Sequence, residues 1–178
     1  MSESMELLRL FESDSRMNKF QNLFKQLIYV LLEENIEYMI IGTVAYSEYA
    51  PPRATTNINF MISESDCCKL ESVLKEHETD FIWNAYKQLI ITVKDDGDET
   101  KKYPFELSFQ STPKGFALSQ PIPKEIFGMA DVPVASVEDL VALCCLAVSN
   151  GNSKSYYDAQ MMIKLQLADV DRCAAVID

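Results

Sequence analysis

The sequence predicts an α/β (α+β) fold, in which a mixed β-sheet is flanked by helices and followed by a helical C-terminal part. Near both ends of the chain, apolar residues recur at three- and four-residue steps, which is typical of helices that cover a sheet. Between these segments lie short apolar runs bounded by turn residues, which are typical of strands. The order of helix, mixed sheet and helices indicates a layered domain.

The first 112 residues alternate between predicted helices and strands. Ser13-Asp14-Ser15 caps a helix that runs to about residue 35. The next elements are expected as a strand at 36–41, a short helix at 44–49, a strand at 57–62, a helix at 64–78, and strands at 81–83, 89–93 and 103–110. Ser63 and Asp66 match a capping box for the helix at 64–78. The acidic turn at 95–98 joins the last two strands into a hairpin.

After residue 111, prolines and glycines predict an irregular connector. Within it we expect a short helical piece at 124–129 and an extended segment at 132–134. Ser136 and Asp139 predict a capped helix, and the C-terminal helices are expected at 137–148, 154–166 and 169–177. We therefore expect a core at 1–112 and a connector with helices at 113–178, packed together as one unit.

Composition restricts the function classes. A formal net charge of -11 makes nucleic acid an unfavourable partner, since no local basic patch offsets it. The five cysteines include two adjacent pairs and no Cys-x-x-Cys, which argues against a disulfide framework or a zinc site. No signal peptide or membrane-spanning run is evident, so a cytoplasmic location with no membrane partner is expected.

The most informative residues lie around the first two predicted strands. Gly42-Thr43 follows the first strand, where a glycine lets backbone N–H groups approach phosphate and a hydroxyl can donate. Asn57 and Asn59 are spaced by two on the second strand, so their side chains share one face. The plain alternative is that they are polar residues of a solvent-facing strand.

These residues resemble the signature of the nucleotidyltransferase-fold superfamily, in particular its defence- and antitoxin-associated branch. That family has Gly-Gly or Gly-Ser, then Arg-x-Thr, then Asp-x-Asp, and a third acid on a neighbouring strand. The corresponding residues here are Gly42-Thr43, Arg53-Ala54-Thr55, Asn57 with Asn59, and Glu106. Downstream, residues 132–143 resemble the family's next helix start, and Lys154 and Asp158 match two positions of a later charged element.

The departures from the family pattern share one direction. In the family, the two aspartates hold divalent metals for phosphoryl chemistry, whereas Asn57 and Asn59 are neutral. Cys144 replaces an expected lysine, and Ser155 replaces an expected acid. The resemblance therefore implies a degenerate site, with Glu106 as the remaining anionic ligand. Aspartate-to-asparagine changes are isosteric and could be natural or engineered; the losses at 144 and 155 favour natural decay.

Three functions follow as hypotheses. The leading one is a catalytically degenerate, regulatory module in a toxin–antitoxin or phage-defence setting. It either keeps a nucleotide site or retains only a surface for a protein partner. The nucleotide-binding candidates are Gly42, Thr43, Arg53, Thr55 and Lys154. The alternative is an active nucleotidyltransferase that binds Mg²⁺ and a nucleoside triphosphate through Glu106, with Asp66 or Asp158. The third is an interaction protein whose cleft is filled by Tyr46 or Phe60.

Overall fold

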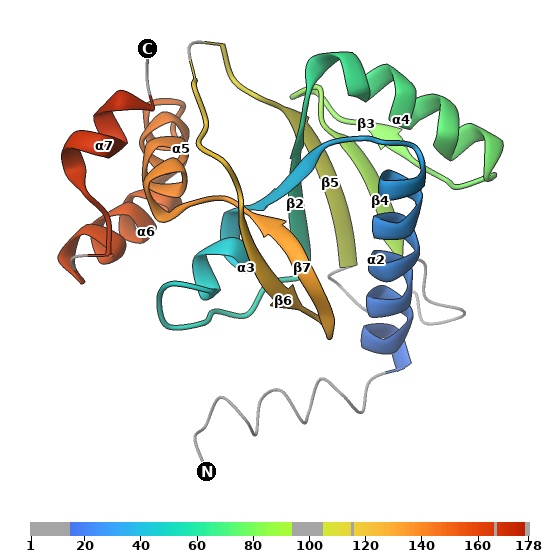
Figure 1. The fold of residues 1–178 in the computed structure, drawn as a ribbon, viewed down its shortest axis with the longest axis horizontal. Coiled ribbons are helices and arrows are strands. Elements are labelled where there is room, and N and C mark those ends of the chain that lie inside the picture. Colours follow the sequence, from blue (N-terminus) through green and yellow to red (C-terminus); the bar gives the residue numbers. More distant parts are fainter. Residues whose placement is uncertain (1–14, 94–104, 115, 166, 177–178) are drawn as a thin grey trace.

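The computed structural model describes residues 15–93, 105–114, 116–165 and 167–176 of the 178-residue chain (Figure 1). The helices are α2 (Ser15–Glu33), α3 (Gly42–Ser47), α4 (Glu64–Glu76), α5 (Val137–Ser149), α6 (Ser153–Lys164) and α7 (Val170–Ala175). The strands are β1 (Tyr38–Ile41), β2 (Asn57–Ile62), β3 (Ile82–Trp83), β4 (Leu89–Val93), β5 (Phe105–Ser111), β6 (Ile122–Ile126) and β7 (Met129–Val134).

Within the described residues these strands form one seven-stranded sheet in the order β3-β4-β5-β2-β1-β7-β6. The pairs β2–β5 and β1–β7 are parallel, and the other neighbouring pairs are antiparallel. The mixed sheet predicted from the sequence is therefore confirmed. The antiparallel β4–β5 pair also confirms the predicted hairpin strands, whereas its turn at 95–98 and the cap residues Ser13 and Asp14 lie outside the described residues.

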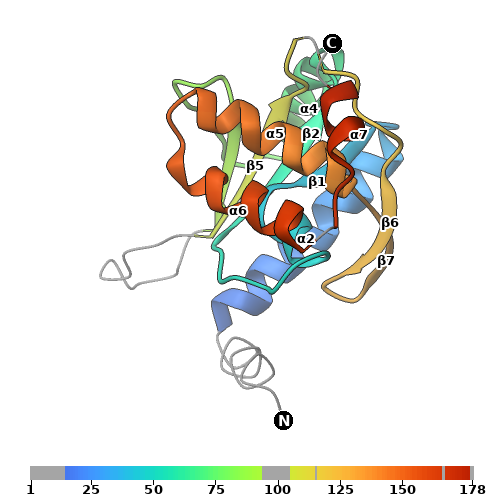
Figure 2. The same ribbon diagram turned by 90° about the vertical axis from the view of Figure 1, so that its left-hand side faces the viewer.

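The two faces of the sheet differ in chemistry. On one face, the Phe20 ring of α2 stacks on Phe105 with 4.8 Å between centroids, and Phe60 stacks on Phe109 at 4.5 Å. Figure 1 shows α2 and α4 on this side, with α5, α6 and α7 on the other; Figure 2 places those three helices in front of the sheet.

In the described parts of the chain, no helix is both long and apolar enough to cross a membrane.

Both predicted capping boxes are present. The Ser63 hydroxyl accepts from the Asp66 N–H at 3.1 Å at the start of α4, and Ser136 accepts from the Asp139 N–H at 3.1 Å at the start of α5. Asp139 is fully buried. Its carboxylate also accepts two hydrogen bonds from Ser119, one from the backbone N–H at 3.1 Å and one from the hydroxyl at 2.6 Å. The cap of α5 therefore also anchors the segment that precedes β6.

The helical piece predicted for residues 124–129 is wrong, because β6 and β7 form a hairpin there. Its turn is made by Phe127 and Gly128, with φ angles of +50° and +73°. The irregular connector expected from the prolines is therefore partly a hairpin. Pro123 lies in β6, an edge strand, where proline is tolerated. It pairs in register with Pro133 of the neighbouring strand β7. The extended segment predicted at 132–134 is the end of β7, which pairs with β1.

Candidate functional site

A cleft with a volume of about 260 Å³ lies on the polar face of the sheet, next to α5 and α6. It brings together the turn after β1, the polar side chains of β2 and β5, and two C-terminal helices. Its lining residues are Ile41, Gly42, Thr43, Tyr46, Arg53, Asn59, Gln110, Leu140, Leu143, Cys144, Ala147, Asn152, Lys154, Ser155, Asp158 and Met162. The cleft therefore includes five of the predicted site residues: Gly42, Thr43, Arg53, Asn59 and Lys154.

Gly42 is fitted closely against β2. It has a φ of +69°, in the left-handed region that favours glycine, and a Cβ at this position would lie 2.5 Å from Nδ2 of Asn59. The preceding residue, Ile41, pairs in register with Asn59, so the turn and the amide are neighbours across the β1–β2 ladder. A side chain at position 42 would displace Asn59, which makes glycine a structural requirement here.

The two asparagines occupy the same face of β2 but have different surroundings. The Oδ1 atom of Asn59 accepts a hydrogen bond of 2.6 Å from the Ser108 hydroxyl on β5. The Oδ1 atom of Asn57 accepts from the Thr56 hydroxyl at 3.0 Å. Asn57 pairs in register with Glu106 of the parallel strand β5, so these two side chains point to the same side. Asn57 and Glu106 are outside the lining of the cleft.

Arg53 connects the loop before β2 to α6. Its Nη1 and Nη2 atoms lie 2.6 and 2.8 Å from the two carboxylate oxygens of Asp158, a bidentate ion pair. Its guanidinium group also lies over the Tyr46 ring, 5.0 Å from the centroid. Thr55 is held locally, since its hydroxyl donates to the Asn57 carbonyl and accepts from the Asn57 N–H, both at 3.1 Å. The cleft does not include Thr55.

The charge of the cleft is opposite in sign to that of the whole chain. Its lining contains two basic residues, Arg53 and Lys154, and one acidic residue, Asp158, which gives a formal charge of +1 against -11 for the protein. Burial, followed by the nearby Asp158 charge, raises the pKa of the Cys144 thiol to about 12. Burial and then Asp158 also raise the pKa of Tyr46. Cys144 is therefore a neutral wall residue where the family has a cation.

The described residues do not provide the carboxylate cage that Mg²⁺ requires. Nowhere in them do three or more His, Cys, Asp or Glu side chains gather closely enough to hold a metal ion. Asp66 is hydrogen bonded to Ser63 beyond the far end of β2, at 2.7 Å, and the Asp158 carboxylate is paired with Arg53. Asparagine carbonyls can ligate Mg²⁺ but add no negative charge. The donor set therefore does not fit a two-metal site.

Sequence reasoning missed several polar residues of this region. Gln110 lines the cleft from β5, and Asn152 lines it from the start of α6, where its side chain caps the Lys154 N–H at 3.1 Å. Strand alternation could have identified Gln110, because residues 106, 108 and 110 share one face of β5. No sequence signal pairs Arg53 with Asp158, which lie 105 residues apart.

Solved structures share this fold and show that it is nucleotidyltransferase-like. The antibiotic-resistance factor ANT(2'')-Ia in solution is similar over 89% of each chain, with 12% identity and a TM-score of 0.57. Its crystal structure with adenylyl-2''-tobramycin matches 89% of this chain and 94% of that one, with 12% identity and a TM-score of 0.58. An antigenic nucleotidyltransferase-like protein from Paracoccidioides brasiliensis matches 83% and 77%, with 15% identity and a TM-score of 0.55.

These likenesses show the fold alone, because all three identities are low. No protein-family model matches the sequence, and a search of the curated proteins found no match. The nucleotidyltransferase fold expected from the resemblance is therefore confirmed at the level of structure. The activity has to be argued from the residues of the cleft.

Proposed function

We propose that this protein is a catalytically degenerate nucleotidyltransferase-fold module that binds a nucleotide in the cleft but does not transfer it. The observation that supports this most directly is Asn59. It lies against the Gly42 turn, where the resemblance expects a metal-binding aspartate, and its carbonyl oxygen already accepts from Ser108. Transfer from a triphosphate depends on metal ions held by carboxylates, and amides supply none of that charge.

The remaining chemistry of the cleft favours a nucleotide as the ligand. Its formal charge of +1 attracts an anion in an otherwise acidic protein. Leu140, Leu143 and Met162 give it an apolar wall against which a base can pack. Of the two side chains expected to fill the cleft if the protein were a plain interaction module, Phe60 lies on the opposite face of the sheet, against Phe24, whereas Tyr46 is buried and forms part of the lining. A regulatory role of this kind suits a toxin–antitoxin or phage-defence setting with a protein partner.

One observation favours an active enzyme as the second candidate. Asp158 lines the cleft together with Gly42 and Asn59, so one carboxylate is present near the turn. It could serve a metal only if the ion pair with Arg53 opened, and Glu106 would have to turn in from beside Asn57. This second candidate therefore needs a rearrangement that the leading proposal does not.

The test is calorimetric titration of ATP, GTP, CTP and UTP with Mg²⁺ into the unchanged protein and into Asn57→Asp/Asn59→Asp. We expect weak binding to the former and tighter, Mg²⁺-dependent binding to the latter, because two carboxylates restore the charge that binds a hard cation. A transfer assay with labelled triphosphates should show no nucleotide incorporation by the unchanged protein.

Asn35→Asp/Asn150→Asp is the matched control. Both positions are exposed and lie outside the lining of the cleft, and the two changes add the same charge. We expect it to bind like the unchanged protein. Transfer of a nucleoside monophosphate by the unchanged protein would overturn the proposal in favour of the enzyme. Absence of binding by every variant would leave the fold as a scaffold for a protein partner.

A further inference from the structure

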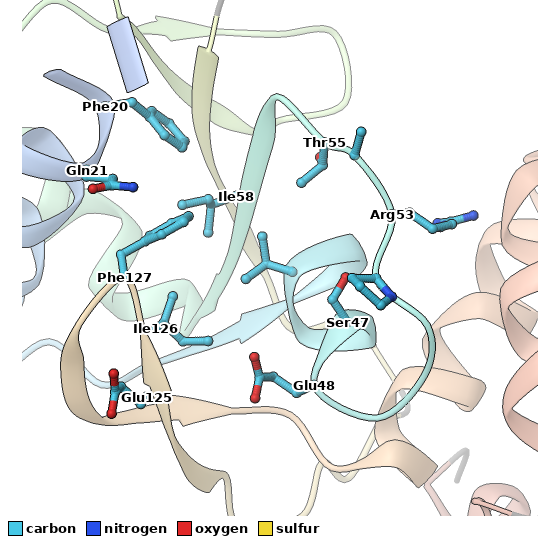
Figure 3. Close-up of a pocket in the computed structure, with 13 residues that line it drawn as sticks. Phe20, Gln21, Ser47, Glu48, Arg53, Thr55, Ile58, Glu125, Ile126 and Phe127 are labelled. Atoms are coloured by element: carbon cyan, nitrogen blue, oxygen red, sulfur yellow. The ribbon is translucent and has the colours of Figure 1, made fainter. Parts of the chain in front are cut away.

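A second cavity, of about 320 Å³, lies on the opposite side of β2 from Asn57 and Asn59 (Figure 3). It is enclosed by α2, α3, the loop before β2, and the turn of the β6–β7 hairpin. Phe20, Ile58 and Ile126 are buried and contribute to its apolar lining. The Phe127 ring completes the wall, in edge contact with Phe20 at 6.3 Å between centroids. None of these residues belongs to the cleft described above.

Two carboxylates stand beside this apolar wall. Glu48 ends α3 and Glu125 lies on β6, and Figure 3 shows the Glu48 side chain reaching toward Ile126. Among the residues that the structure describes, neither carboxylate forms an ion pair or a side-chain hydrogen bond. Glu125 is exposed and Glu48 is half-buried, so water solvates two negative charges at the rim of the apolar cavity.

The basic residues nearby are committed elsewhere. Arg53 is the one cation in the described lining; its guanidinium group is paired with Asp158 and points away from the cavity in Figure 3. Lys124 of β6 is outside the described lining, and its ammonium group lies 5.1 Å from the centroid of the Tyr49 ring. The cavity therefore has a net negative lining and aromatic walls.

We propose that this cavity binds a small organic amine, with an apolar body in contact with Phe20, Ile58 and Phe127 and an ammonium group at Glu48 and Glu125. A carboxylate forms a charge-assisted hydrogen bond with an ammonium group, and the aromatic rings pack against the apolar body. The net charge of -11 concentrates cations around the protein and repels anions of the same shape. The ligand would lie behind the loop that carries Arg53, and so beside the cleft without entering it.

The test is a titration with 2-phenylethylamine, followed by calorimetry and by chemical shifts of the lining residues. The matched probe is 2-phenylethanol, which has a similar shape and no charge. We expect the amine to bind and the alcohol to bind at least about tenfold more weakly, since it lacks the ionic contact. Glu48→Gln and Glu125→Gln should each weaken amine binding several-fold. Ala54→Phe, which fills the cavity from the exposed loop, should abolish it.

Glu76→Gln is the control, because it removes the same charge from an exposed site on α4. It should leave amine binding unchanged, and thermal unfolding would verify that each variant is folded. Equal binding of amine and alcohol would overturn the proposal, as would full amine affinity in the Glu48→Gln/Glu125→Gln protein. Absence of binding up to about 10 mM amine, a threshold in the range of the weakest specific affinities, would also overturn it.

Discussion

Arg53 is the residue whose role the structure changes most. The resemblance implies that it contacts phosphate, yet its guanidinium group is held by both carboxylate oxygens of Asp158 and by the Tyr46 ring. An arginine in a bidentate pair has few donors left for a ligand. In this structure the ion pair therefore reduces the anion affinity of the cleft, and Lys154 is the remaining basic residue of the lining.

Asp158→Asn should release Arg53 and increase the affinity of the cleft for pyrophosphate in the absence of metal. We expect an increase of about tenfold, because an uncompensated guanidinium group forms charge-assisted hydrogen bonds with phosphate oxygens. Stability should fall by about 1–3 kcal/mol, since the Arg53 side chain is 36% exposed but that of Asp158 only 15%. Titration calorimetry measures the first effect and urea unfolding the second.

Asp171→Asn is the matched control, since it removes the same charge from an exposed position on α7. If Asp158→Asn and this control gave equal pyrophosphate affinities, the ion pair would not be what limits anion binding.

The sequence predicted several residues of the cleft but not the ion pair between Arg53 and Asp158. Gly42, Thr43 and Asn59 were predictable, because a glycine turn and strand alternation are local patterns. The ion pair of Arg53 depends on how α6 packs against the loop before β2, and no local pattern contains that information. The positions of Thr55 and Glu106 outside the lining were likewise set by tertiary packing.

At the scale of elements, the capped helices were the most predictable parts. The Ser-x-x-Asp pattern identified the starts of α4 and α5 because its hydrogen bonds involve only neighbouring residues. The β6–β7 hairpin was not predicted, since its strands alternate weakly and each contains a proline, Pro123 in the edge strand β6 and Pro133 in β7. The strand order could not be predicted from local patterns either, because one neighbour of β1 in the sheet is β7, which lies far along the chain.

The two capping boxes should differ in their contribution to stability. Asp139→Ala should lower the free energy of unfolding by about 2–4 kcal/mol, because it leaves the Ser119 N–H and two hydroxyls without their buried acceptor. Asp66→Ala should cost about 1 kcal/mol or less, because its partner Ser63 lies at a more exposed helix start where water can substitute. Urea unfolding of both variants gives the comparison, and equal losses would contradict it.

At the scale of the whole molecule, two tyrosine hydroxyls and one thiol with raised pKa values should make the free energy of unfolding fall at alkaline pH. Burial raises the pKa of Tyr38 to about 12, and burial followed by the Glu48 charge does the same for Tyr49, whose hydroxyl donates to the Ala135 carbonyl at 2.9 Å. Cys144 is raised to about 12 as well. The unfolded chain would lose these protons at its ordinary pKa values, roughly 8.5 for cysteine and 10 for tyrosine.

The contribution of these three groups to stability should therefore be constant below about pH 8. It should fall as the pH rises from about 9 to 12, since the folded state binds more protons than the unfolded state in that interval. We expect a loss on the order of 5 kcal/mol at pH 11 relative to pH 7.5, measured by urea unfolding. Tyr38→Phe should reduce this dependence, whereas Tyr86→Phe, at an exposed position, should leave it unchanged. A flat profile up to pH 11 would contradict the assignment.

The pairing of β1 with β7 also has consequences for a truncated chain and for the chain during its synthesis. Ile40 and Val134 are partners in the sheet, so β1 receives its second neighbour only when residues far along the chain are present. A fragment that ended at residue 112 would leave the apolar strand β1 as an open edge, and such edges recruit strands from other molecules. During synthesis, the first half of this protein is therefore exposed to self-association until the β6–β7 hairpin emerges and covers it.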